Sequence, residues 1–409
     1  MTPATVPSVE DVPLPEIDVL GEAFAADPLG VLADARRRGD GLARSHRGVE
    51  VLSYDRVAAQ LHDDRFHTVD ARHFKQKGGP DSLLRFAEDG LLLSMDKPRH
   101  DRVRRILARA FTLRRVDEQR EVMREVATRW IDRFAATGRC DLVDDFTQHY
   151  PMEVLCRLIG VPPADIPRFV DAAHDLHLLA AVPMAPGFER IDRALATLEA
   201  YVLDIVERRR QQPEADVLTG LLEAQALEGH LTESELVGNV VNLLFAGAGT
   251  TRYQLASAVR DLVVHGWWER LAAEPDLVPA ALEEAMRFAP VTQFVVRIPD
   301  DDVEVEGLRY LARRRVILNL LAASRDPAMF PEPDRFDPLR DNVARSRLPF
   351  GWGTHHCLGH ALARAAMREA LLLLTARFTD VRIDGDVELA PAAAMLRGPE
   401  HLPLAFVTR

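Results

Sequence analysis

The chain has 409 residues, 47% of them hydrophobic and 28% charged, which is typical of a globular protein long enough to bury a large core. Its formal net charge of −12 argues against general nucleic-acid binding, which needs a basic surface, and against a permanent position on anionic lipid. Three widely spaced cysteines, Cys140, Cys156 and Cys357, favour a reducing compartment over a disulfide framework.

Residues 1–18 are rich in proline and acidic residues, and we expect them to be a loosely ordered tail. They contain neither the basic start nor the apolar stretch of a signal peptide. The most apolar stretch, residues 236–264, still carries Asn239, Asn242 and Arg252, which indicates a buried helix and not a membrane span. The sequence therefore predicts a cytoplasmic protein without a membrane segment.

The first predicted elements are short. Asp27-Pro28 is expected to start a helix that ends near Gly39, and a β-hairpin follows, with its turn at Arg47-Gly48. Helical patterns then extend over residues 54–288. Residues 68–95 interrupt them and contain Gly-Gly-Pro, which indicates a long functional loop.

The longest predicted helix extends from Thr232 to His265, which is long for a globular protein. Thr232 and Glu235 form a capping box at its start. Two internal glycines, Gly247 and Gly249, each cost about 1 kcal/mol relative to alanine in a helix.

From residue 289 to residue 320 the pattern changes to short strands, and a proline-rich irregular stretch follows. A final helix is expected to start at Cys357 and to end near Arg377, and short strands close the chain. Because no internal repeat or linker is present, the sequence predicts one mainly α domain over residues 1–409, with a small β portion.

Residues 350–364 read FGWGTHHCLGHALAR. A cysteine at a helix start can be held as a thiolate, and Phe350 could exclude water from it. Nearby glycines leave room for a flat macrocycle: Gly351, Gly353 and Gly359. Two other interpretations stay open at this point, a buried free cysteine and a zinc site that uses His355, His356 and Cys357. Adjacent residues rarely converge on one tetrahedral ion, which disfavours zinc.

This stretch resembles the haem-binding signature of the cytochrome P450 family, Phe-Gly-x-Gly-x-His-x-Cys-x-Gly. All fixed positions are filled: Phe350, Gly351, Gly353, His355, Cys357 and Gly359. The resemblance implies that Cys357 is the proximal ligand of haem b (iron protoporphyrin IX), whose thiolate pushes electron density onto the iron. It also implies the cytochrome P450 fold, with the haem between the long central helix and the Cys357 helix.

Other motifs follow in the family's order. Glu284 and Arg287 match its Glu-x-x-Arg, and Arg335 is expected to be the third member of that salt-bridge network. The resemblance also implies that four donors face the haem propionates: His100, Arg104, Arg297 and His355. Such charge-assisted bonds are worth about 1.5–3 kcal/mol each.

The long helix carries AGAGTT, residues 246–251, where the family usually has Ala-Gly-x-acid-Thr-Thr. We expect Ala246 to border the haem, and Gly249, Thr250 and Thr251 to form the catalytic segment. The threonine hydroxyl orders water in the helix groove, but Gly249 stands where the proton-delivering acid is expected. Three explanations stay open: water alone conducts protons, a substrate group assists, or the reaction depends less on fast O–O cleavage.

Substrate contacts are expected from apolar residues around the distal haem face, because ligand pockets are mostly apolar. The candidates are Leu92, Leu93, Leu178, Val241, Leu244, Phe245, Val291, Phe294, Val295 and Met395. They suggest a mid-sized, largely apolar small molecule. Many bacterial members of the family act in natural-product pathways, so the resemblance makes a secondary-metabolite intermediate plausible.

Electrons are expected from an external ferredoxin and its reductase. Residues 97–115 are strongly basic in an acidic chain, and Arg102, Arg105 and Arg109 could face a small acidic ferredoxin. A solvated basic helix explains the same pattern equally well.

The resulting functional hypothesis is a haem-thiolate monooxygenase that uses dioxygen. One alternative is oxidative coupling or dehydrogenation on the same haem without oxygen insertion, which Gly249 keeps open. The other is a non-catalytic haem protein, which Thr250 disfavours because a carrier needs no proton-relay hydroxyl.

Overall fold

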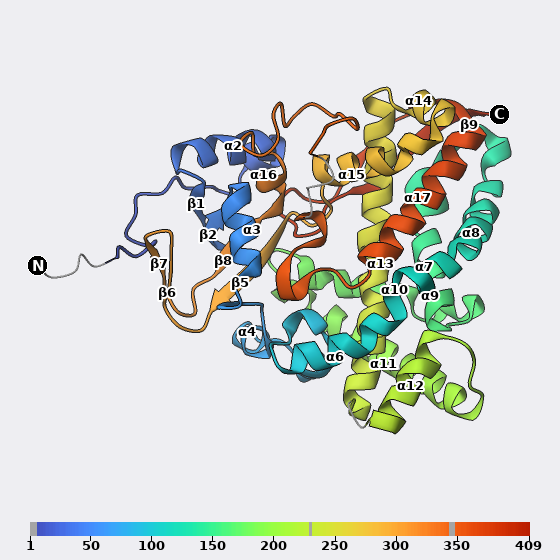
Figure 1. Ribbon diagram of the computed structural model, residues 1–409, viewed down its shortest axis with the longest axis horizontal. Coiled ribbons are helices and arrows are strands. Elements are labelled where there is room, and N and C mark those ends of the chain that lie inside the picture. The colour runs from blue at the N-terminus through green and yellow to red at the C-terminus, as the bar shows by residue number, and fades with distance from the viewer. Residues whose placement is uncertain (1–5, 229–230, 343–347) are drawn as a thin grey trace, which may run out of the picture.

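The structure is a computed structural model that describes residues 6–228, 231–342 and 348–409. Helices make up one broad part of the molecule, and the largest sheet lies at the opposite end with the first helices (Figure 1). The longer helices are α2 (Pro28–Arg38), α3 (Tyr54–His62), α6 (Arg99–Ala108), α8 (Arg120–Asp132), α9 (Tyr150–Ile159), α11 (Phe188–Gln211), α12 (Val217–Glu228), α13 (Glu233–Val264), α15 (Val278–Phe288) and α17 (His360–Arg377).

The largest sheet confirms the predicted hairpin. Its strands lie in the order β1 (Leu42–Ser45), β2 (Gly48–Val51), β8 (Val316–Asn319), β5 (Phe294–Pro299) and β3 (Phe66–His67). Strands β2 and β8 are parallel, and the other neighbours are antiparallel. Buried side chains such as Val49, Val51 and Leu318 pack with Val57 and Leu61 of α3 in a core of their own. The sheet thereby brings Arg297 of β5 into the interior.

The expected tail differs from the structure over its described part, residues 6–18. Val9 and Ile17 are buried, and their amides donate to the carbonyls of Arg309 and Arg44 at 3.0 and 2.8 Å. Two apolar side chains and paired backbone groups hold this segment on the sheet end of the molecule. Residues 1–5 lie outside the described residues.

The prediction of a long loop at 68–95 is wrong. The segment contains α4 (Ala71–Gln76), α5 (Asp81–Arg85) and a π-helical turn, Phe86–Gly90. The turn approaches α13 so closely that a Cβ atom on Gly90 would lie 2.7 Å from the backbone of Gly238. Gly90 therefore lets this helical turn pack tightly against α13.

Helix α13 confirms the predicted long helix and passes through the helical part of the molecule (Figure 1). Its capping box is complete, since the Thr232 hydroxyl accepts from the Glu235 amide at 3.1 Å and the Glu235 carboxylate accepts from the Thr232 amide at 3.0 Å. The helix continues without a break through Gly247 and Gly249. It contacts α9, α10 (Val170–Asp175), α11, α15 and α17.

The final helix, α17, starts at His360 and not at Cys357. The Cys357 amide donates to the Phe350 carbonyl at 2.8 Å, so the cysteine backbone belongs to the preceding turn. Gly359 is the residue before the first helical turn. Among the described residues, no helix is both long and apolar enough to cross a bilayer.

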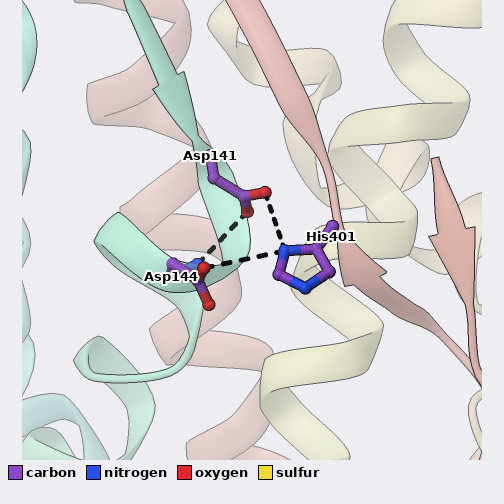
Figure 2. A group of neighbouring side chains, drawn as sticks. All are labelled: Asp141, Asp144 and His401. Atoms are coloured by element: carbon purple, nitrogen blue, oxygen red, sulfur yellow. Dashed lines mark hydrogen bonds and ion pairs between the residues drawn. The ribbon is translucent and has the colours of Figure 1, made fainter. Parts of the chain in front are cut away.

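The chain ends in a small antiparallel sheet of β4 (Arg139–Asp141), β12 (Pro403–Thr408) and β9 (Phe378–Ile383). Figure 2 shows the ion pairs at its edge: His401 Nδ1 lies 3.2 Å from Asp141 and 3.6 Å from Asp144. The two aspartates hydrogen-bond or pair with this histidine and raise its pKa. This exposed cluster ties β11 (Pro399–His401) to the segment around β4.

Candidate active site

Residues 350–360, here called the cysteine loop, form a tight turn before α17. The Gly351 amide donates to the Leu348 carbonyl at 2.8 Å. Gly351 and Gly353 both have φ values of +69°, a conformation that other residues rarely adopt. A side chain on Gly353 would also overlap the backbone of Leu61 in α3. The loop conformation therefore requires glycine at both positions.

Cys357 is partly buried, and burial of the thiol raises its pKa. A backbone hydrogen bond from Gly359 and the guanidinium groups of Arg104 and Arg364 act in the opposite direction. Arg364 lies 4.3 Å from the centre of the Phe350 ring and is paired with Glu283. The free thiol is therefore protonated at neutral pH, and a metal ion that binds it must displace the proton.

Donor groups from three separate elements gather beside the cysteine loop. The rings of His100 (α6) and His355 lie 4.7 Å apart, and Arg104 donates to the His356 carbonyl at 2.6 Å. Burial, followed by the neighbouring Arg297, His100 and Arg104, lowers the pKa of His355 to about 3. The four donors implied by the family resemblance are thus brought together.

Two of these donors lack the partners that buried polar groups normally have. His100 Nε2 is enclosed and has no hydrogen-bond partner in the described part of the chain. Arg297 is 4% exposed, and its guanidinium donates to the carbonyl of its own neighbour, Val296, at 3.1 Å. Burial lowers the pKa of Arg297 to about 10. A ligand carboxylate would satisfy the Arg297 guanidinium directly, and it would satisfy His100 Nε2 once that nitrogen carries a proton.

Gly359 gives a further indication of the group that fits here. Its φ of −85° is open to any residue, and a Cβ atom added to it would meet no atom of the chain within 4 Å. Beside the Cys357 thiol and donors that lack carboxylate partners, this open face fits a flat macrocycle with two propionates. The zinc alternative finds no support, because Cys357 belongs to no group of three potential metal ligands among the described residues.

On α13, the side of the helix that carries Ala246 and Thr250 is open. Ala246 is exposed, and Thr250 Oγ1 donates to the Ala246 carbonyl at 3.1 Å. Thr251 is partly buried at the next position. Gly249 lies under the ring of His177, a residue that the sequence analysis missed. The available signal was the spacing of His174 and His177 in the apolar segment HDLHLLAA.

The Glu-x-x-Arg pair is fully buried, with Arg287 Nη2 2.7 Å from Glu284 Oε1. The prediction that Arg335 is the third member of this network is wrong, because its side chain is 62% exposed and pairs with Glu332 and Asp337. Arg340 occupies that position instead, 8% exposed and 3.6 Å from Glu284. Arg335 contributes only its backbone carbonyl, which accepts from both Arg287 and Arg340.

The candidate substrate residues divide into groups. Val241 and Leu244 are fully buried in the core, on the side of α13 turned away from Ala246. Phe294 is buried beneath the Arg47 guanidinium, and Leu93 is 40% exposed. Leu92 and Val291 are buried at 7% exposure. The partly exposed candidates are Leu178, Phe245, Val295 and Met395.

The basic segment is less open than its sequence suggests. Arg102 donates to Glu235 of α13 at 2.5 and 3.0 Å, so this arginine joins two helices. Arg105 and Arg109, one turn apart, are exposed.

Comparisons with known proteins agree with this site. The family model for cytochrome P450 matches residues 272–393, which include the Glu-x-x-Arg pair and the cysteine loop. Mycinamicin IV hydroxylase/epoxidase of Micromonospora griseorubida is 36% identical over 87% of this chain and 89% of its own length. The cytochrome P450 monooxygenase PikC of Streptomyces venezuelae is 32% identical over 96% of this chain and 94% of its own.

This chain belongs to the cytochrome P450 family. The fold agrees as well, because the crystal structure of CalO2 superposes with a TM-score of 0.87 at 29% identity, covering 96% of this chain and 99% of that one. As a P450 monooxygenase, the protein is an oxidoreductase that uses haem, dioxygen and electrons from a redox partner.

Proposed function

We propose that this P450, as a single catalytic unit over residues 1–409, holds haem b through Cys357 and oxygenates a mid-sized, largely apolar natural-product intermediate. The observation that carries the proposal is the cysteine loop, where the partly buried Cys357 thiol lies beside donors without carboxylate partners. The substrate class is supported by the relative whose name gives mycinamicin IV as the compound that it hydroxylates or epoxidises. A cytoplasmic location is part of the proposal.

The residues of this chain would divide the work as follows. Cys357 would ligate the iron, while His100, Arg104, Arg297 and His355 would bind the propionates and fix the plane of the macrocycle. A thiolate-ligated haem supplies dioxygen activation when bound. Thr250 would hold a water molecule in the groove of α13, and its hydroxyl would pass protons from that water toward the distal side. Ala246 would leave space there.

The ligand assignment is tested with Cys357→Ser. The reduced carbon-monoxide complex of the wild type should show the strongly red-shifted Soret band of thiolate ligation, and the variant should lose it. Cys156→Ser is the control, because that thiol is buried in the helical core and should leave the band unchanged. A band that persists in Cys357→Ser would refute the assignment.

Oxygen insertion is tested with labelled dioxygen. Candidate substrates, with mycinamicin IV among them as the first probe, are selected by the shift that they cause in the Soret band. We expect one labelled oxygen atom in the product. A product that is oxidised but unlabelled would show coupling or dehydrogenation instead.

We also propose that electrons arrive from a small acidic ferredoxin at the exposed arginines after the middle of α6. The support is local positive charge, at Arg105 and Arg109, on a chain with a net charge of −12.

A further inference from the structure

The ring of His177 occupies the space above Gly249 of α13. His177 lies in the short 3-10 helix η7 (Leu176–Ala180), and a Cβ atom built on Gly249 would overlap its Nε2 and Cε1 atoms. Phe245, about one turn earlier on α13, packs on the same imidazole with ring centres 5.2 Å apart. Position 249 is therefore glycine because an imidazole from another helix fills the place of its side chain.

The hydrogen bonds of His177 define its tautomer. Nδ1 lies 3.1 Å from the His174 carbonyl, which can only accept, so Nδ1 carries the proton and Nε2 carries a lone pair. Nε2 is enclosed and has no partner in the described part of the chain. A buried polar group in this state destabilises the fold unless a water molecule or ligand satisfies it. His177 thus presents an unsatisfied acceptor beside the residue that precedes Thr250.

Other polar groups connect this position with the surface. The His174 ring lies 6.3 Å from that of His177, and its Nε2 atom is also enclosed. Arg252, on the next turn of α13, interacts electrostatically with both histidines and lies 2.8 Å from Glu400. The Glu400 side chain is 40% exposed. Glu400 is therefore the solvent-exposed end of this group of polar side chains.

We propose that the imidazole of His177 replaces the carboxylate missing at position 249: Nε2 holds a water molecule beside Thr250 and relays protons to it from the Glu400 side. This inference rests on the proposed monooxygenase function. Each turnover consumes one dioxygen, two protons and two electrons from the redox partner, and one oxygen atom leaves as water. His177 takes up a proton at Nε2 and releases it to the held water, so it is unchanged after each cycle.

The acidity of the ring suits this role. Burial, followed by His174 and Arg252, lowers the pKa of His177 to about 4. The protonated ring is then as strong an acid as an ordinary aspartic acid, whose pKa is about 3.9. The protonated His177 ring would therefore release a proton to water as readily as the carboxylic acid that the family usually has at position 249.

The experiment is a double-mutant cycle of His177→Ala and Gly249→Asp in the haem-bound enzyme without substrate. A plant-type ferredoxin and its reductase supply electrons from NADPH, and dioxygen is the probe. Reduction to hydrogen peroxide uses two electrons and two protons, whereas reduction to two water molecules uses four of each. The ratio of NADPH to dioxygen consumed therefore reports how well protons are delivered, with 1 for peroxide and 2 for water as the limits.

We expect His177→Ala to move this ratio toward the peroxide limit and to increase the solvent isotope effect on water formation. Gly249→Asp alone should lower the melting temperature, because its side chain collides with the imidazole. The double variant should regain both melting temperature and ratio, since removal of the ring makes space for the carboxylate. His46→Ala, an exposed histidine, is the matched control and should change nothing.

An unchanged ratio in His177→Ala would overturn the relay. A melting temperature unaffected by Gly249→Asp would overturn the packing on which it rests. Nitrogen-15 NMR of labelled histidine gives a readout independent of turnover, and a proton on Nε2 in place of Nδ1 at pH 7 would contradict the tautomer. Failure of the proposed function can be distinguished from failure of the relay alone. If the proposed function is wrong, the wild type itself lacks the thiolate Soret band, and both the function and the relay are then overturned.

Discussion

Gly249 shows how the meaning of a single residue depends on what packs against it. In the sequence it is a glycine at the position where the family motif usually has an acidic residue. In the structure it is the gap that admits His177. Arg335 and Arg340 give a second example, since both lie in the same proline-rich stretch but only Arg340 reaches the buried Glu284.

The two arginines should therefore differ in their effect on stability. The Arg340 guanidinium donates to the carbonyls of Pro331, Glu332 and Arg335 and lies beside Glu284. Arg340→Ala should lower the free energy of unfolding by about 2 kcal/mol, because three carbonyls lose a charged donor and the buried Glu284 carboxylate loses a nearby positive charge. Arg335→Ala, which removes exposed pairs only, should change it by less than about 0.5 kcal/mol.

Urea unfolding followed by far-UV circular dichroism measures this difference in the haem-bound protein. Equal midpoints for the two variants would mean that Arg340 is not the third member of the Glu284 network.

At the scale of elements, the start of α13 combines two functions in one carboxylate. Glu235 caps the helix through the Thr232 amide and also pairs with Arg99 and Arg102 of α6. Burial opposes its ionisation, but Arg102, the Thr232 backbone and Arg99 outweigh burial and lower its pKa to about 2. The helix that carries Thr250 is thereby anchored to the helix that carries His100 and Arg104.

This anchor should depend on pH. A carboxylate whose folded-state pKa is about 2 contributes stability above its unfolded pKa of about 4.3, and that contribution is lost as the pH falls toward 2. Glu235→Gln keeps the capping geometry but not the charge. The wild type should therefore melt at a higher temperature than this variant at pH 6–7, and the difference should shrink steadily below about pH 4.5.

Melting temperatures of both proteins measured across this range test the assignment. The control is Glu118→Gln, whose partner Arg114 is 83% exposed and 3.8 Å away, and which should differ little from the wild type at any pH. A wild-type advantage that persists undiminished at the lowest pH would contradict the role of the Glu235 charge.

For the whole molecule, charge distribution governs how a redox partner approaches. The chain has a net charge of −12, yet Arg105 and Arg109 are exposed together after the middle of α6. Arg102 belongs to the interior network of Glu235, so its substitution would disturb α13 and would not report on docking. Arg105 and Arg109 are therefore the residues to test.

Arg105→Glu combined with Arg109→Glu should slow reduction by an acidic ferredoxin about 10-fold at low salt, because steering by opposite charge accelerates encounter. The effect should fade as salt rises, since the Debye length is about 8 Å at physiological ionic strength. Stopped-flow reduction kinetics measure it, with the Soret spectrum as a check on the haem. Arg37→Glu combined with Arg38→Glu makes the same charge change on exposed residues of α2 and is the control. Equal rates for both double variants would exclude this docking site.

The sequence by itself determined what depends on residues close together in the chain. The capping box of α13, the hairpin at Arg47-Gly48 and the cysteine motif are all specified by hydrogen bonds or backbone conformations within a few positions. The cysteine motif also predicted the positions of Cys357 and His355, although the helix after it begins at His360 and not at Cys357.

Only the tertiary structure decided which distant residues meet. The apparent loop at 68–95 became helical because apolar residues such as Phe74, Leu83 and Phe86 are buried and Gly90 packs on α13. Packing likewise placed His177 over Gly249 and Arg340 beside Glu284. The physical reason is that burial and long-range electrostatic contacts act on the positions of side chains in space, and local sequence spacing does not encode those positions.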